Sequence, residues 1–411
     1  MKPVVRTAIA VAGVAALCAG CASSTTDTAT SSSSAAPTTT TATAEVGAAT
    51  PVLASVVAAP VPVAATDGKV HLAYELQLVN AMGFDVTLTS LAVKAGDQSL
   101  LTLTGDQLAY WTRALGAGQT PTTKLGPGQS GIVWLDVAVD GSTPVPTELT
   151  HTLDVTLAKP MPPLLPATMT EDVAHVTVSD HRPAVISPPL DGPMWLDGNS
   201  CCDMTAHRMA MNPLNGQLWA AERFAIDYLQ LSPDGTVFKG DRSRPESYPY
   251  FGANIHAVAD GPVVGVMDGL PEQVAGQSPT GLPLDQYGGN HVVQDIGDGN
   301  YAFYAHLKTG SVKVKPGDQL TSGQVIANLG NTGNTDAPHL HFHVMSTPDP
   351  LRSNGLPFVF ASFELDGMMA SMDGLDSLLQ GQPAPMKPGF TPRDETETSP
   401  LTLDVMTYGN G

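Results

Sequence analysis

Three histidines stand at alternate positions in the stretch "DAPHLHFHVM", residues 336–345: His339, His341 and His343. Side chains two residues apart in an extended strand point to the same face. The spacing therefore predicts a strand with imidazoles along one side and Leu340 and Phe342 on the other. Histidine is the commonest metal ligand and the usual proton carrier near neutral pH. The pattern indicates metal binding, proton transfer or both.

Other segments of the chain supply partners for these histidines. The pieces "RFAID" (223–227), "YAHL" (304–307), "KPGDQLTSGQVIANLGNTG" (315–333) and "PHLHFHV" (338–344) follow one another in that order. Their combination resembles the lysostaphin-type (LytM-like) zinc metallopeptidases, which cut peptide cross-bridges in bacterial cell walls. The resemblance implies a compact antiparallel β-fold with zinc bound in a groove.

A catalytic zinc takes three protein ligands and keeps a fourth position for water, and neutral imidazoles nearby can move protons. The resemblance implies that Asp227 and His341 hold one Zn²⁺ per chain and that His306 and His339 are the catalytic pair. In relatives the place of His343 is often Glu or Gln, so His343 is interpreted as a support for a ligand or a groove residue. A solvent-facing position is the alternative for His343.

The first zinc ligand of the family is a histidine four residues before the aspartate, and this chain has Arg223 there. Arginine stays protonated and offers no lone pair, so it cannot bind zinc and is assigned to the surroundings of the groove. A literal HxxxD exists at His291–Asp295. We set it aside because that stretch aligns with the strand pair leading into "YAHL".

Hairpin geometry suggests a replacement ligand. The segments "AHRMAM" and "QLWAAERFAID" flank "NPLNG", a strong turn signal, and folding the chain there sets His207 opposite about 221–224. We therefore predict a zinc site of Asp227, His341 and His207. The alternative is that His207 is a surface residue and the zinc site is incomplete.

Adjacent cysteines, Cys201 and Cys202, precede His207 in a "CC…HR" element that a subset of the family shares. An oxidising compartment favours a disulfide over thiolates. A bridge between neighbours strains the peptide, so free thiols and an intermolecular pair stay open.

Strands must position all of these residues. Runs such as "KVHLAYELQLVNA" and "GIVWLDVAVDG" alternate apolar and polar residues and predict an immunoglobulin-like β-sandwich over 51–181. Similar patterns predict a second all-β domain with the antiparallel sheet of the lysostaphin-type fold over 182–371. A turn-rich tail is expected over 372–411.

The first 21 residues combine a basic start with an apolar run too short to span a membrane comfortably, which is typical of an export signal. "CAGC" resembles a bacterial lipobox with Cys21 as the lipid-modified residue, although Cys18 departs from the pattern. An ordinary secretory signal is the alternative. Residues 22–50 are a Ser/Thr/Ala tether that cannot bury a core. We expect an exported protein, lipid-anchored on the outer side of the bacterial plasma membrane or in the cell envelope.

The formal net charge of −20, with 14% charged residues, argues against nucleic acid or an anionic membrane surface as a partner. Membrane contact is expected through the lipid alone. The predicted function is a zinc-dependent endopeptidase acting on peptidoglycan peptide cross-bridges. The alternative is an inactive envelope protein of the same fold that binds peptidoglycan or regulates another hydrolase. The β-sandwich is interpreted as a spacer or a docking domain for an envelope partner.

Overall fold

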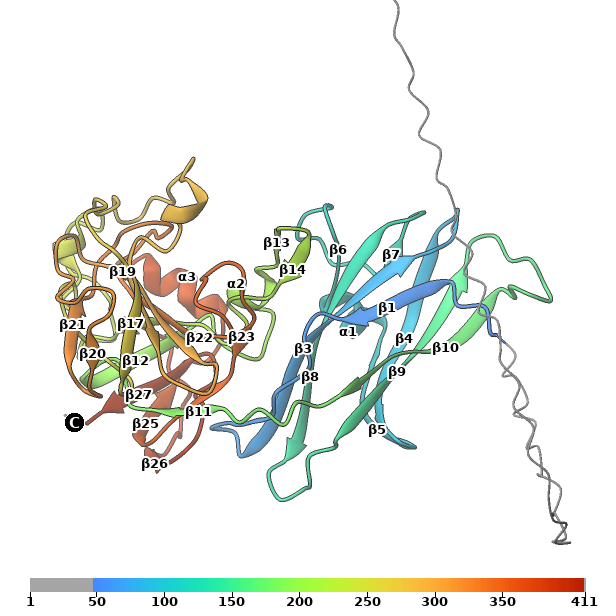
Figure 1. Cartoon of the computed structure of the whole chain (residues 1–411), viewed down its shortest axis with the longest axis horizontal. Helices are drawn as coiled ribbons and strands as arrows, with labels where there is room; N and C mark the ends of the chain where they lie inside the picture. The colour runs from blue at the N-terminus through green and yellow to red at the C-terminus, as the bar shows by residue number, and fades with distance from the viewer. Residues whose placement is uncertain (1–46, 410–411) are drawn as a thin grey trace, which may run out of the picture. The chain divides into compact units, whose positions relative to one another are not determined.

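The computed structural model describes residues 47–409, and strands dominate its secondary structure (Figure 1). The expected export signal, Cys21 and most of the tether lie outside the described residues. Residues 47–50 have no regular secondary structure. Within residues 47–409, no helix has the length and apolar character needed to cross a membrane.

The N-terminal part folds as two antiparallel sheets, both seen on the blue-to-green side of Figure 1. One sheet contains β1 (Val52–Val56), β3 (Lys69–Asn80), β8 (Ser130–Asp140) and β6 (Thr112–Ala114), with β2 (Val63–Ala64) paired to β3. The other contains β10 (Thr168–Thr177), β9 (Glu148–Leu157), β4 (Val86–Ala95) and β5 (Gln98–Thr104), with β7 (Lys124–Leu125) paired to β4; helix α1 (Gly105–Tyr110) follows β5.

A single core joins these two sheets. Leu72 and Leu76 of β3 are fully buried with Leu91 of β4 and Leu153 of β9 in one apolar cluster. Inward-facing residues at alternate positions give β9 one buried face, as the sequence pattern predicts, whereas residues 71–76 of β3 are buried on both faces. The β-sandwich is therefore present, and the immunoglobulin-like topology stays a prediction.

The C-terminal part is built on one large sheet. In the described chain its strand order is β20 (Gln319–Leu320), β17 (Gly261–Met267), β18 (Asn290–Asp295), β19 (Tyr301–Leu307), β22 (Leu340–Met345), β15 (Ile226–Gln230), β12 (Gly192–Gly198), β27 (Asp404–Tyr408), β25 (Phe363–Met368) and β26 (Arg393–Glu395), with β23 (Gly355–Leu356) paired to β22. The three strands that carry the expected site residues, β19, β22 and β15, are neighbours in the middle of this sheet.

Short elements surround the large sheet. They are the strand pairs β11 (Ala184–Ile186) with β24 (Phe358–Phe360), β13 (Asn212–Leu214) with β14 (Gln217–Trp219) and β16 (Asn254–His256) with β21 (Val325–Asn328), the helices α2 (Ala206–Met209) and α3 (Asp373–Leu379), and the 3₁₀ turns η1 (Pro245–Ser247) and η2 (Leu284–Gln286).

The expected tail is partly structural. Within 372–411 the chain forms α3 and then β27, which pairs with β12 on one side and β25 on the other. Val405 and Met406 of β27 are fully buried in the core of the large sheet. The expectation of a separate turn-rich tail is corrected by this strand. Its short apolar run is surrounded by turn residues in the sequence.

The expected hairpin before Asp227 is shorter than its sequence pattern suggested. It spans only β13 and β14, with Asn215 and Gly216 at φ values of 51° and 78° in the turn. Residues 206–209 form the helical turn α2, whose start is capped by the Thr205 hydroxyl accepting from the Arg208 amide. His207 therefore lies on a helical turn, and the expected cross-strand position is wrong.

The chain from Ala49 onward forms one compact unit. A small apolar cluster contributes to it and combines residues of both parts of the chain. Val63 and Ala73 of the sandwich pack in this cluster with Cys201, Phe224 and Val359. The loops that lead to the expected site residues therefore rest against the first sheet of the sandwich.

His71 on β3 gives the sandwich a pH-dependent stability. Its ring nitrogens lie 2.9 Å from Asp136 Oδ1 and 3.2 Å from Asp67 Oδ1. Burial disfavours the charged ring, but Asp136 outweighs this and raises the pKa of His71. Because the folded pKa exceeds the unfolded value of about 6.5, the stabilisation is complete below about pH 6.5 and is lost as pH rises through the folded pKa.

We expect His71→Gln to lower the free energy of unfolding by about 1–3 kcal/mol at pH 6, and by less at pH 9. Urea unfolding of the wild type and the variant at both pH values measures the difference. An equal deficit at pH 6 and pH 9 would contradict a charged His71.

Candidate metal centre and active site

Side chains from four separate segments converge on one groove. His207, Asp227, His306, His339 and His341 all line a cavity of about 420 Å³. Register explains much of this convergence: Asp227 of β15 lies directly opposite His341 of β22. The sheet thus brings together residues that are more than a hundred positions apart in the chain.

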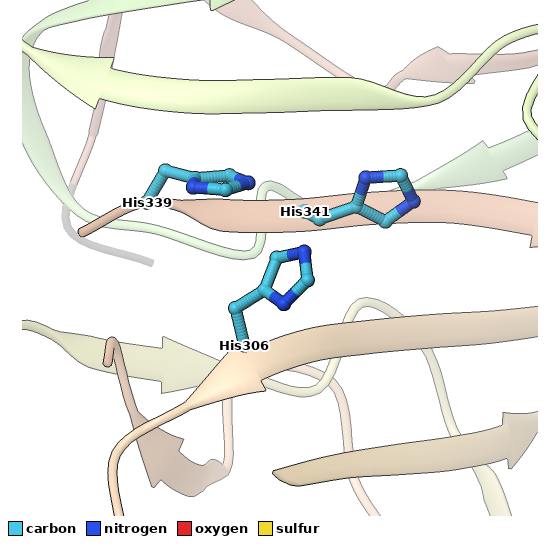
Figure 2. Close-up of side chains that lie close together, drawn as sticks. All are labelled: His306, His339 and His341. Carbon is cyan, nitrogen blue, oxygen red and sulfur yellow. The ribbon is translucent and has the colours of Figure 1, made fainter. Parts of the chain in front are cut away.

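Alternation in β22 separates core residues from groove residues. Leu340 and Phe342 are fully buried in the core of the sheet. His341 and His343 point to the opposite face, and His339 directly precedes the strand. Figure 2 shows the rings of His339 and His341 extending from one strand, with the ring of His306 reaching toward them from the neighbouring strand.

His306 reaches the groove because β19 is irregular at its end. Ala302 and Tyr304 of this strand face the core, and strict alternation would send His306 there as well. The pairing of β18 with β19 is interrupted near this point, and His306 has a φ of 59°, in the left-handed region. A bulge of this kind re-aims a side chain. It sets the His306 ring 4.7 Å, centroid to centroid, from that of His339.

Asp227 lies at the centre of the cluster. Its Oδ1 is 3.0 Å from His341 Nδ1 and 3.2 Å from His339 Nε2. Its Oδ2 is 3.2 Å from His207 Nε2 and accepts a 3.0 Å hydrogen bond from Asn199. Burial opposes ionisation of the carboxyl, yet His207 and His339 hold the pKa of Asp227 well below its usual range. The site is therefore built around one carboxylate.

His207 is buried and held in one orientation. Its Nδ1 donates to the Ala225 carbonyl at 3.0 Å, which requires the proton on Nδ1 and directs Nε2 to Asp227. Burial favours the neutral ring, but the Asp227 carboxylate outweighs burial and raises the pKa of His207 to about 9. Backbone donation through Nδ1 is the usual way in which a metal-binding histidine is oriented.

His306 and His339 are also fixed through Nδ1. His306 donates to the Thr332 carbonyl at 2.7 Å, and His339 donates to the Ala337 carbonyl at 2.8 Å. Burial, reinforced by His339 and His341, lowers the pKa of His306 well below its usual value. His306 is therefore neutral, with Nε2 as the ring nitrogen able to accept a proton.

His343 supports His341 from the side away from Asp227. The two residues are joined by a 2.8 Å contact between His341 Nε2 and His343 Nδ1. His343 is 1% exposed, so the solvent-facing alternative is wrong. This contact occupies His341 Nε2 and leaves His341 Nδ1 facing the carboxylate.

Among the described residues, two possible metal-binding sets share His341. They are His207 with Asp227 and His341, and His306 with His339 and His341; in each set the ligand atoms lie within 4.8 Å of one another. Imidazole nitrogen and carboxylate oxygen are the donors that zinc takes in catalytic sites, so these residues fit a zinc ion.

A third possible set, His71, Asp136 and Cys202, lies outside the groove. Its sulfur is not a free thiolate, because Cys202 is bonded to Cys201 in a disulfide. That disulfide belongs to the loop that connects β12 to α2.

Arg223 does not line the groove, which corrects the expectation that it borders the zinc site. Its side chain is 3% exposed and turns toward Glu75 of β3, where Arg223 Nε lies 3.0 Å from both carboxylate oxygens. His291 of the literal HxxxD is likewise outside both metal-binding sets, and its Nδ1 contacts the Gly289 carbonyl at 2.8 Å.

Sequence reasoning missed the groups that orient the histidines. Asn199, Thr332 and Ala337 touch Asp227, His306 and His339 respectively. Two of these contacts use backbone carbonyls, which carry no residue-type signal. Asn199 precedes the paired cysteines, and its distance from Asp227 in sequence hides the contact.

The large sheet and its histidine-lined groove make up an all-β domain with side chains that fit a metal ion. Residues 248–353 match Peptidase family M23, so the chain contains a domain of this family, as the lysostaphin-type motifs predicted. The matched residues include His306, His339, His341 and His343. They begin after His207, Arg223 and Asp227, so Arg223, where this chain departs from the family pattern, lies outside the match.

Two curated proteins are similar over part of their length. Peptidoglycan DD-endopeptidase ShyA of Vibrio cholerae serotype O1 is 32% identical over 100 residues, which cover 23% of this chain and 23% of that protein. Cell division protein DipM of Caulobacter vibrioides is 33% identical over 97 residues, which cover 24% of this chain and 14% of that protein. The chain thus spans less than a quarter of the length of either relative.

Solved structures that are similar to part of this chain were also found. The catalytic domain of the prophage-encoded M23 protein EnpA from Enterococcus faecalis, in a mutant form, is 18% identical, with 42% of this chain and 93% of that chain covered and a TM-score of 0.26. The catalytic domain of lysostaphin from Staphylococcus simulans is 20% identical, with 40% and 84% covered and a TM-score of 0.22.

Tyr304 is a core residue of β19, the strand that also carries His306. Its hydroxyl donates to Gln294 Oε1 at 2.7 Å and accepts from the Val258 amide at 2.9 Å, and the residue is fully buried. We expect Tyr304→Phe to lower the free energy of unfolding by about 1–3 kcal/mol, because two buried polar groups lose their partner. Zinc affinity should be unchanged. Chemical unfolding and zinc titration measure the two effects, and weaker zinc binding by a folded variant would contradict a purely structural role.

Proposed function

We propose that the C-terminal domain is a zinc-dependent endopeptidase that hydrolyses peptide bonds in peptidoglycan, with one zinc per chain held by His207, Asp227 and His341. The contact between His207 Nε2 and Asp227 Oδ2, at 3.2 Å, carries this proposal. It offers an imidazole to the carboxylate in place of the family histidine, a role that Arg223 cannot fill.

Charge favours this set over the one formed by His306, His339 and His341. A divalent cation gains most from a site that contains an anionic ligand, and Asp227 is the carboxylate that contacts all three surrounding imidazoles. The choice also leaves His306 and His339 free for proton transfer, in agreement with their roles in the family.

Zinc bound in such a site lowers the pKa of a water molecule and polarises a scissile carbonyl. His306 and His339 are both held through Nδ1 by backbone carbonyls. His306 keeps Nε2 for exchange with water or substrate, whereas His339 directs Nε2 to Asp227 Oδ1 at 3.2 Å. A neutral ring can accept a proton from the attacking water and return it to the leaving amine. Once it has accepted that proton, the ring can donate a hydrogen bond through Nε2 to the oxygen on which negative charge develops.

Similarity and groove shape support peptidoglycan peptides as the substrate. One relative carries the name of a peptidoglycan DD-endopeptidase. A second cavity of about 570 Å³ shares Gly288, Phe303, Pro350 and Leu351 with the metal-site cavity, so the groove continues beyond the histidines. An extended peptide could lie along both cavities.

The export signal and lipid at Cys21 would place the protein on the outer side of the membrane, where this substrate lies. The inactive alternative rested on Arg223 alone. A replacement ligand at His207 weakens that alternative, and activity measurements decide between them.

We expect the wild type to retain about one zinc per chain after dialysis, and His207→Ala and His341→Ala to lose it. His306→Ala should retain zinc because its ring is not a ligand in the proposed set. Metal analysis by mass spectrometry measures stoichiometry. Zinc retained by His207→Ala and lost by His306→Ala would assign the metal to the other set.

A double variant provides a control for the proposal that His207 replaces the family histidine at position 223. We expect Arg223→His not to restore zinc binding to His207→Ala, because the side chain at 223 points to Glu75 and does not line the groove. Recovery of zinc in the double variant would mean that the family ligand position is still functional.

Activity tests the catalytic pair separately from the metal. We expect His306→Gln and His339→Gln to keep zinc but to cleave purified peptidoglycan on the order of 10²–10⁴ times more slowly, since each loses a group that accepts protons. Chromatography of released muropeptides follows the reaction. A zinc-loaded wild type with no cleavage of any muropeptide would favour the inactive alternative.

A further inference from the structure

We propose that the β-sandwich positions the metal ligands, because Glu75 of β3 anchors both segments that present His207 and Asp227. This inference rests on the proposed zinc site. It assigns Glu75 as a positioning residue and gives the sandwich a role other than that of a spacer.

Glu75 is a buried carboxylate with two arginine partners. It is fully buried and lies opposite Trp134 in the pairing of β3 with β8. Arg223 contacts both of its oxygens, and Arg208 Nε lies 3.8 Å from Oε1. Arg208 and Arg223 are themselves only 1% and 3% exposed. Buried charges are tolerated only when paired, so this arrangement fixes all three side chains.

The first anchored segment carries His207. Arg208 follows it on α2, a helical turn of four residues that is too short to be stable alone. The sandwich holds this turn directly: Trp134 Nε1 donates to the Arg208 carbonyl at 2.6 Å, and the Arg208 guanidinium donates to the Leu135 carbonyl at 3.3 Å. The position of His207 therefore depends on β8 as well as on Glu75.

The second anchored segment carries Asp227. Arg223 lies in the turn before β15, two residues before Ala225, whose carbonyl orients His207. The Arg223 guanidinium also donates to the Gly355 carbonyl at 3.4 Å. Glu75 thus holds one end of the segment that supplies both the carboxylate and the carbonyl acceptor for the replacement ligand.

These contacts give the arginine at the family ligand position a function. The metal-binding histidine is supplied by α2, and the residue at 223 ties its segment to the sandwich. Loss of the Glu75 charge would leave two buried guanidinium groups without a carboxylate and would free both segments to shift. A displacement of a ligand by about 1 Å is enough to weaken a preorganised site.

The test uses the full chain and measures metal affinity, with Zn²⁺ and with Co²⁺, whose visible absorption reports the ligands directly. We expect Glu75→Gln, which keeps the side-chain size, to weaken binding by about 10–100-fold. Glu75→Asp, which keeps the charge, should recover part of this loss. Trp134→Phe removes the hydrogen bond to the Arg208 carbonyl and part of a buried ring but keeps the Glu75 charge, and it serves as a second variant if Glu75→Gln does not fold.

A matched control breaks a different contact between the two parts of the chain. Arg393 donates to the Thr66 carbonyl at 2.6 Å, away from α2 and the turn at 223. Arg393→Met should leave metal affinity unchanged.

Folded Glu75→Gln and Trp134→Phe variants with wild-type affinity and an unchanged Co²⁺ spectrum would overturn this inference and leave the proposed metal site intact. A wild-type protein that binds neither ion would instead overturn the proposed function, and this inference with it.

Discussion

The site depends on the contacts that compensate the charge of the buried Asp227 carboxylate. Its side chain keeps only 17% of its surface exposed, so its charge must be compensated by neighbours. Three imidazoles and one amide supply that compensation from separate segments. Each of the three imidazoles is in turn held by a backbone carbonyl or by another histidine. The groove is therefore a layered set of hydrogen bonds that converge on one negative charge.

This layering separates the tasks of similar side chains. His341 and His343 share a strand face, yet His341 contacts the carboxylate and His343 contacts His341. His306 and His339 face each other across neighbouring segments of chain, with their Nδ1 atoms committed to carbonyls. The role of each histidine in the site is thus decided by the groups that its two ring nitrogens contact. Residue type alone therefore does not distinguish the roles of these four histidines.

The sequence predicted the sheet and much of the groove, because alternation and motif order are local signals. Period-2 patterning is enough to place Leu340 in the core and His341 on the opposite face. Three features escaped such reasoning. The bulge at His306 and the helical turn under His207 are local backbone irregularities, and the destination of Arg223 depends on Glu75, 148 positions earlier in the chain. Long-range pairing of buried charges leaves no periodic trace in a single sequence.

The place of β27 in the large sheet has a consequence for how the protein is made. Strand β12 leads into the loop that carries Asn199 and then α2, and its two edges pair with β15 and β27. One edge of β12 therefore stays open during folding until residues 404–408 pair with it. Pairing between such distant segments is slow because a long loop must close first. Until this loop closes, the folding chain presents an unpaired strand edge beside the forming groove. Such an edge can pair with another chain, so it needs protection during folding.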